Sequence, residues 1–150
     1  MDSKMQSQQL SGWNKAMLAH NESAEQSITT PYVATMDFGR QAISEMLTRQ
    51  PELEAVICSH EMIALGVLFE CQRRLVQVPR MLALACVEGS ANCDHIQPSL
   101  TSVRIDYSKM ARDTAKKLQK WLAGSDIEGD FCETQEDIIF PYKFEVRQST

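Results

Sequence analysis

Polar and charged side chains follow two short apolar segments of the chain. His60 and Glu61 come soon after residues 54–58, and Glu88 follows residues 81–87 directly. Continuous apolar runs of this length are typical of strands that are buried on both faces of a parallel sheet. Open α/β sheets bind ligands outside the carboxyl ends of their strands. These three side chains are therefore candidates to bind a polar small molecule.

A purely structural role for His60 and Glu61 is the alternative. Both residues stand at the start of a predicted helix that runs to about Arg74, with Ser59 as the predicted N-cap. A glutamate in the first turn stabilises a helix through its dipole, and the histidine would then simply be exposed. The residue types alone leave both interpretations open.

The cysteines raise the possibility of a metal site or a thiol nucleophile. They are Cys58, Cys71, Cys86, Cys93 and Cys132, an odd number with no CxxC pair, which favours a reduced, cytoplasmic protein. Cys93 and His95 are too close in sequence for the usual zinc pairings, so we expect no metal. A cysteine nucleophile with His60 or His95 as its base remains a minor alternative, since no nucleophile elbow or glycine-rich phosphate loop accompanies it. We therefore expect that the protein binds no cofactor and that it is not an enzyme.

The composition is that of an ordinary globular protein, whose fold must position these residues. The chain has 150 residues, 43% of them apolar, and a net charge of −5. That length is sufficient for one domain with a core of its own. The acidic balance argues against nucleic-acid binding by this chain, because phosphate contacts need clustered lysines and arginines. No apolar run is long enough to span a membrane, and the first residues lack the apolar core of a signal peptide.

Helical and strand patterns alternate along the chain. Asp37 is the predicted cap of the second helix, and Pro51 ends it. The helix at 107–123 is predicted to turn Met110, Thr114, Leu118, Trp121 and Leu122 inward. The alternation predicts an α/β fold, a parallel-sheet sandwich with helices on both faces. The predicted helices are 4–20, 37–50, 60–74 and 107–123; the predicted strands are 28–36, 54–58, 81–87, 100–103, 138–140 and 142–146; an acidic loop is predicted at 125–137.

The helix at 60–74 carries two apolar stripes. The first consists of Ile63, Ala64, Val67 and Cys71, and the second consists of Met62, Leu65 and Phe69. A helix that lies on a sheet needs only one such stripe. The second stripe therefore predicts a partner helix, most simply from a twin subunit in a homodimer.

Six motifs along the chain resemble those of LacI/GalR transcriptional regulators, and they occur in that family's order. The segment Phe69-Glu-Cys-Gln-Arg73 is similar to the gluconate-operon repressor branch. Any one motif would be weak, but the ordered set covers nearly the whole chain. The motifs are Gly12-Trp13 with Ala16-Met17, residues 54–66, residues 78–85, residues 98–104, residues 110–118 and residues 143–150.

The resemblance implies the C-terminal lobe of a periplasmic-binding-protein-like (type I) effector domain. Residues 1–100 would form this lobe, residues 101–137 would cross into an N-terminal lobe, and residues 138–150 would return. The resemblance further implies a cytoplasmic regulator of the repressor type that senses a small sugar or sugar acid. Operator DNA would be bound only by a helix-turn-helix domain, whose pattern this chain does not contain. Closure of the cleft on its effector would change the spacing of the paired DNA-binding domains.

The resemblance also assigns positions at the effector site. Gln9 stands where the family commonly has an arginine that binds sugar hydroxyls. His60 and Glu61 stand at an Asn-Asp pair, and Glu88 stands at an aspartate. All four positions are polar but altered in type, so the effector can differ from the family's usual sugars. A periplasmic-type sugar receptor of the same fold is the alternative function, and it would need a secretion signal.

Overall fold

The computed structural model describes residues 4–20, 34–123 and 140–150. Helices and strands alternate in it, which confirms the predicted α/β class. In chain order the elements are α1 (Lys4–Ala19), α2 (Met36–Arg49), β1 (Ala55–Cys58), α3 (Glu61–Arg73), β2 (Ala83–Cys86), the short 3₁₀ helix η1 (Ala91–Asp94), β3 (Thr101–Ile105), α4 (Tyr107–Leu122) and β4 (Tyr142–Glu145).

The sheet has the strand order β1-β2-β3-β4. β1, β2 and β3 are parallel, with Cys58 opposite Cys86 at the carboxyl ends of β1 and β2. β4 runs antiparallel to β3, and Ile105 at the end of β3 lies opposite Tyr142 at the start of β4. The predicted parallel sheet is therefore confirmed for three strands and carries an antiparallel fourth strand at its edge.

The core lies between the sheet and the helix pair α2–α3. Val67 and Leu68 of α3 and Leu84 of β2 are almost completely buried there. On β1, Val56 and Cys58 face this core, whereas Ala55 and Ile57 on the other face are exposed. Within the described residues, helices therefore cover one face of β1, and the apolar run of this strand has a second, open face.

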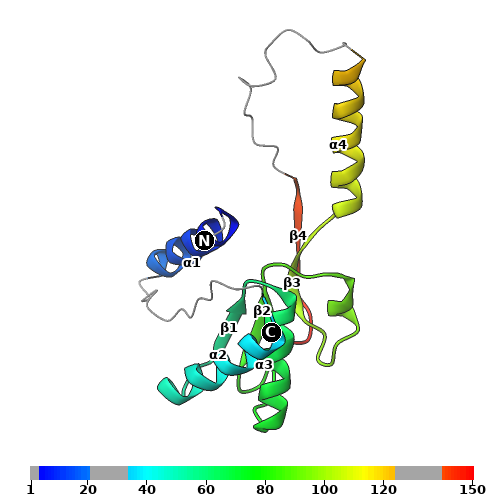
Figure 1. Cartoon of the computed structure of the whole chain (residues 1–150). Coiled ribbons are helices and arrows are strands. Elements are labelled where there is room, and N and C mark those ends of the chain that lie inside the picture. The colour runs from blue at the N-terminus through cyan, green and yellow to red at the C-terminus, as the bar shows by residue number, and fades with distance from the viewer. Residues whose placement is uncertain (1–3, 21–33, 124–139) are drawn as a thin grey trace.

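Glycines set the distance between α2 and α3. A Cβ atom at Gly39 would lie 2.1 Å from the carbonyl oxygen of Ile63, and one at Gly66 would lie 2.0 Å from that of Met36. The two backbones approach so closely that neither position has room for a side chain. Figure 1 shows the two helices crossing beside the sheet.

The predicted caps of both of these helices are wrong by one or two residues. Thr35 caps α2, because it is extended and its side-chain oxygen accepts from the N–H of Phe38 at 3.1 Å. Asp37 lies within the first turn and pairs with Arg40 instead. His60, rather than Ser59, caps α3 in the same way. The strand predicted at 28–36 lies mostly outside the described residues, and its last residues are not in a strand.

The apolar stripe of α4 is exposed rather than turned inward as predicted. No residue of α4 is buried, and Leu118 and Trp121 are 52% and 41% exposed. The helix projects away from the sheet and the α2–α3 pair (Figure 1). Helical periodicity shows which face of a helix is apolar but not whether anything covers that face. The predicted loop 125–137 and residues 138–139 lie outside the described residues.

The C-terminal residues are attached to the sheet. The hydroxyl of Ser149, which is fully buried, donates to the carbonyl of Leu84 at 2.6 Å and accepts from the N–H of Thr101 at 2.8 Å. Arg147 donates to Asp94 at 2.6 Å and to the carbonyl of Leu100 at 2.7 Å. The tail therefore joins β2, β3 and η1. Among the described residues, no helix is long and apolar enough to cross a membrane.

Candidate effector site at the strand ends

His60 forms the turn between β1 and α3. Its ring Nδ1 accepts a hydrogen bond from the backbone N–H of Met62 at 3.1 Å. A neutral imidazole has one donor and one acceptor nitrogen, so this bond assigns the proton to Nε2. The side chain is half-buried and can offer that N–H to a ligand. His60 thus has the structural role of an N-cap, and within the described residues its Nε2–H makes no hydrogen bond and is available for the predicted binding role.

Glu61 faces the protein interior. The residue is 8% exposed, and its carboxylate accepts from the N–H of Ser90 at 2.6 Å, from the Asn92 amide at 3.5 Å and from the Cys93 thiol at 3.6 Å. Burial alone would raise the pKa of Glu61, but these hydrogen bonds outweigh it and the pKa is lowered. The carboxylate therefore holds the loop that contains η1.

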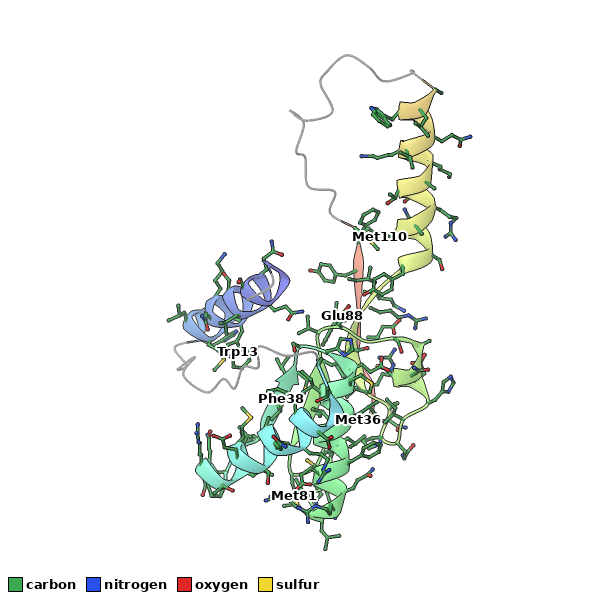
Figure 2. All side chains as sticks on the ribbon, viewed as in Figure 1. Trp13, Met36, Phe38, Met81, Glu88 and Met110 are labelled. Carbon is green, nitrogen blue, oxygen red and sulfur yellow. The ribbon has the colours of Figure 1, made fainter. Side chains whose placement is uncertain are left out.

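Glu88 follows β2 and meets the start of α4. Its backbone carbonyl accepts from the N–H of Glu61 at 3.0 Å, and its side-chain Oε1 accepts from the hydroxyl of Tyr107 at 2.9 Å. Burial, together with the Glu88 carboxylate, raises the pKa of the Tyr107 hydroxyl. Figure 2 shows Glu88 at the end of the sheet that faces α4.

Tyr107 joins the candidate site through its hydrogen bond to Glu88, although the sequence did not single it out. It stands after Asp106, which follows β3 and caps α4. The sequence offered one signal for this role: Tyr107 follows β3, the third parallel strand. The carboxyl ends of parallel strands lie at the same edge of the sheet, so a residue after β3 lies near those after β1 and β2. The structure therefore brings His60, Glu61, Glu88 and Tyr107 together at this edge.

Within the described residues, no hydrogen bond joins Gln9 to the residues at the strand ends. It lies on α1, is half-buried, and makes no hydrogen bond to His60, Glu61 or Glu88 within the described part of the chain. Its predicted role as a sugar ligand therefore rests on the family resemblance alone.

The thiols have the character of core residues. Cys58, Cys71, Cys86 and Cys93 are free and buried, and Cys132 lies outside the described residues. Burial raises the pKa of Cys58 to about 12 and that of Cys71 to about 11. These thiols remain protonated at neutral pH and are poor nucleophiles. No cluster of potential metal ligands occurs in ranges 4–20, 34–123 and 140–150.

The two apolar stripes of α3 differ in burial: the first is buried, and the second is partly exposed. Ile63, Ala64, Val67 and Cys71 are buried against the sheet and α2. In the second stripe Met62 and Leu65 are half-buried, and Phe69 is 49% exposed. An apolar surface therefore remains on the outer side of this helix.

Residues 7–150 match the family model of the periplasmic binding protein-like domain. The chain belongs to this family. It is 30% identical over 113 residues to the HTH-type transcriptional regulator IdnR of Escherichia coli, an alignment that covers 73% of the chain and 34% of the relative. The LacI/GalR resemblance of the six motifs is thereby confirmed.

Solved structures show the same fold. A PurR-family transcriptional regulator from Vibrio parahaemolyticus is 35% identical with a TM-score of 0.84, over 95% of this chain and 50% of that one. A CelR–cellobiose complex is 24% identical with a TM-score of 0.80, over 97% of this chain and 42% of that one. The chain thus spans about a third of the curated relative and about half of these solved chains.

Proposed function

We propose that the chain is the C-terminal lobe of the effector-binding domain of a LacI-type transcriptional regulator. The observation that carries the proposal is the continuous match of residues 7–150, together with 35% identity to a PurR-family regulator. Residues 1–100 form the lobe, residues 101–137 cross toward the second lobe, and residues 138–150 return. The names of the relatives favour a cytoplasmic regulator over both a periplasmic receptor and an enzyme.

A small sugar is the proposed effector. His60 and Glu88 present polar groups at the carboxyl ends of β1 and β2, where ligands of open α/β sheets bind. The solved CelR relative is a complex with cellobiose. Glu61 contributes by holding the η1 loop, and Gln9 remains a proposed contact from α1.

The test is a ligand titration of the 150-residue chain with a panel of mono- and disaccharides. Backbone amide shifts in NMR spectra report binding, and we expect changes at Glu88, Gly89 and Ser90. His60→Ala removes a donor and should weaken the binding. A panel in which no sugar perturbs these amides contradicts the proposed function.

The outer stripe of α3 is the proposed homodimer surface. Met62, Leu65 and Phe69 present apolar area on one side of this helix. Phe69→Lys should shift a self-associating chain toward monomer in sedimentation velocity, because the ammonium must be desolvated at the interface. Leu18→Lys is the matched control, since Leu18 is 71% exposed on α1 and lies outside the stripe. Equal effects of the two substitutions would contradict the proposed surface.

Operator binding is proposed to belong to a domain outside this chain. The only helical face rich in lysine among the described elements is on α4, which contains Lys109, Lys116, Lys117 and Lys120. We propose that these lysines form a solvated surface. A sequence-specific gel shift with the 150-residue chain alone would contradict this assignment.

A further inference from the structure

Arg147, which follows β4, is almost enclosed by the protein. Its side chain is 9% exposed although the guanidinium is always charged. It donates to the carbonyl of Leu100 at 2.7 Å and to the hydroxyl of Ser102 on β3 at 2.8 Å. It also pairs with Asp94 of η1, 2.6 Å away, and with Glu145 of β4. A charge in such surroundings is stable only when it is paired and hydrogen-bonded, and this one joins η1, β3 and β4.

The contacts of Arg147 reach both ends of the η1 loop, residues 88–95. At the far end the guanidinium holds Asp94, the last residue of η1. At the near end it holds Ser102, and a Cβ atom at Gly89 would lie only 2.5 Å from the Ser102 hydroxyl oxygen. The N–H of Gly89 also donates to the carbonyl of Val103 at 3.1 Å. Arg147 therefore fixes the η1 loop against β3.

Glu61 of α3 holds the same loop from another side. Its carboxylate accepts from the N–H of Ser90 at 2.6 Å and from the thiol of Cys93 at 3.6 Å. Its own N–H donates to the carbonyl of Glu88, the first residue of the loop, at 3.0 Å. The η1 loop is thus attached both to the start of α3 and to Arg147. The place of the Glu88 side chain, a proposed effector contact, depends on both attachments.

Arg104 of β3 is a natural comparison for Arg147. It pairs with the same two carboxylates, at 3.7 Å from Asp94 and 3.2 Å from Glu145. Its side chain is 41% exposed, and among the described residues no hydrogen bond joins it to Ser102. Ion pairs of such exposure contribute little. The two arginines therefore bring the same charge to the same partners, but Arg147 alone of the two is bonded to β3.

We propose that Arg147 is a positioning residue of the candidate effector site, which fixes the η1 loop and through it Glu88. This rests on the proposed function, since it concerns the same site. Arg147 acts from behind the loop and not as a ligand contact. Lysine in its place can pair with Asp94, but it lacks the planar fork of donors that also reaches Ser102. Substitution by lysine therefore counts as a loss of the positioning contact.

The first test follows the carboxyl carbon of Glu61 by NMR in pH titrations of the ligand-free chain. Hydrogen bonds from the η1 loop lower the pKa of Glu61 against the effect of burial. Arg147→Met releases the loop, so we expect the pKa of Glu61 to rise. Arg104→Met removes a charge from the same carboxylates and should leave it unchanged. An unchanged pKa in Arg147→Met, or an equal rise in both variants, overturns the inference. Arg147→Lys retains the charge and replaces Arg147→Met where that variant does not fold.

The second test measures binding, with cellobiose as the probe and the Gly89 amide signal as the reporter. We expect Arg147→Met to weaken the binding at least about tenfold, because a site whose supporting contacts are lost holds its ligand groups less well. Arg104→Met should leave the affinity nearly unchanged. Equal losses in the two variants overturn the inference. A wild-type chain that binds no sugar of the panel contradicts the proposed function, and the titration of Glu61 then still decides whether Arg147 positions the loop.

Discussion

The role of a carboxylate in this structure depends on which side chains surround it. Glu70 of α3 is 3% exposed and accepts from Arg73 at 2.9 Å and from Arg74 at 2.6 Å. Hydrogen bonds from Arg73 and then Arg74 lower the pKa of Glu70 to about 2. Glu88 contrasts with it, because within the described residues Glu88 accepts from Tyr107 and lacks a basic partner. The neighbours of Glu70 thus stabilise the fold, whereas Glu88 stays a proposed ligand contact.

The pKa of Glu70 makes stability depend on pH in a definite direction. The folded pKa of about 2 lies below the ordinary glutamate pKa of 4.5, so the ion pairs stabilise the fold above pH 4.5. Their contribution is lost as the pH falls from about 4.5 toward 2. We expect the free energy of unfolding in urea to fall less over this range for Glu70→Gln than for the wild type. Equal acid sensitivity of the two proteins would contradict this assignment.

At the scale of elements, the close crossing of α2 and α3 determines how both helices lie on the sheet. Gly39→Ala places a Cβ 2.1 Å from a backbone carbonyl oxygen, so the two helices must separate. We expect a loss of about 1–3 kcal/mol in the free energy of unfolding, measured by urea denaturation.

Gly12→Ala is the matched control for this substitution. Nothing lies within 4 Å of a Cβ at Gly12 of α1. Alanine is a better helix former than glycine by about 1 kcal/mol, so this variant should be neutral or slightly more stable. A similar loss in both variants would mean that helix crossing is not the cause.

The elements that the sequence predicted well are those whose pattern is local. The apolar runs at 54–58 and 81–87 contain β1 and β2, and the stop at Pro51 agrees with the end of α2 at Arg49. The caps were harder to predict, because Ser59 and His60 are adjacent and both can accept from an amide. Local patterns thus located the elements but not their terminal contacts.

The parts of the site that the sequence did not predict depend on distant contacts. The inward position of Glu61 is set by the η1 loop, whose Ser90 lies 29 positions further along the chain. Tyr107 reaches Glu88 from the start of another helix, across 19 positions. No periodicity in the sequence carries such information. The identity of the strand-end residues was predictable, whereas the directions of their side chains were not.

At the scale of the whole molecule, α3 and α4 stand in opposite environments. α3 contains Ala64, Val67 and Cys71 in the core, whereas no residue of α4 is buried. Isolated helices of this length are marginal in water, because most helical stability in proteins comes from packing. The two helices should therefore differ in local stability.

Hydrogen exchange measures this difference directly. We expect the backbone amides of α4 to exchange at least about a hundredfold faster than those of α3, since α4 can open without disturbing the core. Ser102 of β3, which pairs with Cys86 of β2 on one side and with Glu145 of β4 on the other, serves as an internal reference for slow exchange. Equal protection of α3 and α4 would show that α4 is stabilised by packing after all.

The pairing of β3 with β4 has a consequence for the way this chain is built. The two strands are antiparallel neighbours, with Ile105 opposite Tyr142, so the polypeptide from 106 to 141 is topologically one very long β-hairpin connection. The entropy of closing such a connection exceeds that of a short turn by only about 2 kcal/mol. Replacing residues 106–141 by a two-residue Asn-Gly turn should therefore leave the sheet and the α2–α3 pair folded and remove α4 with its exposed apolar face. The remaining sheet and helix pair would then be a minimal domain onto which other connections can be grafted.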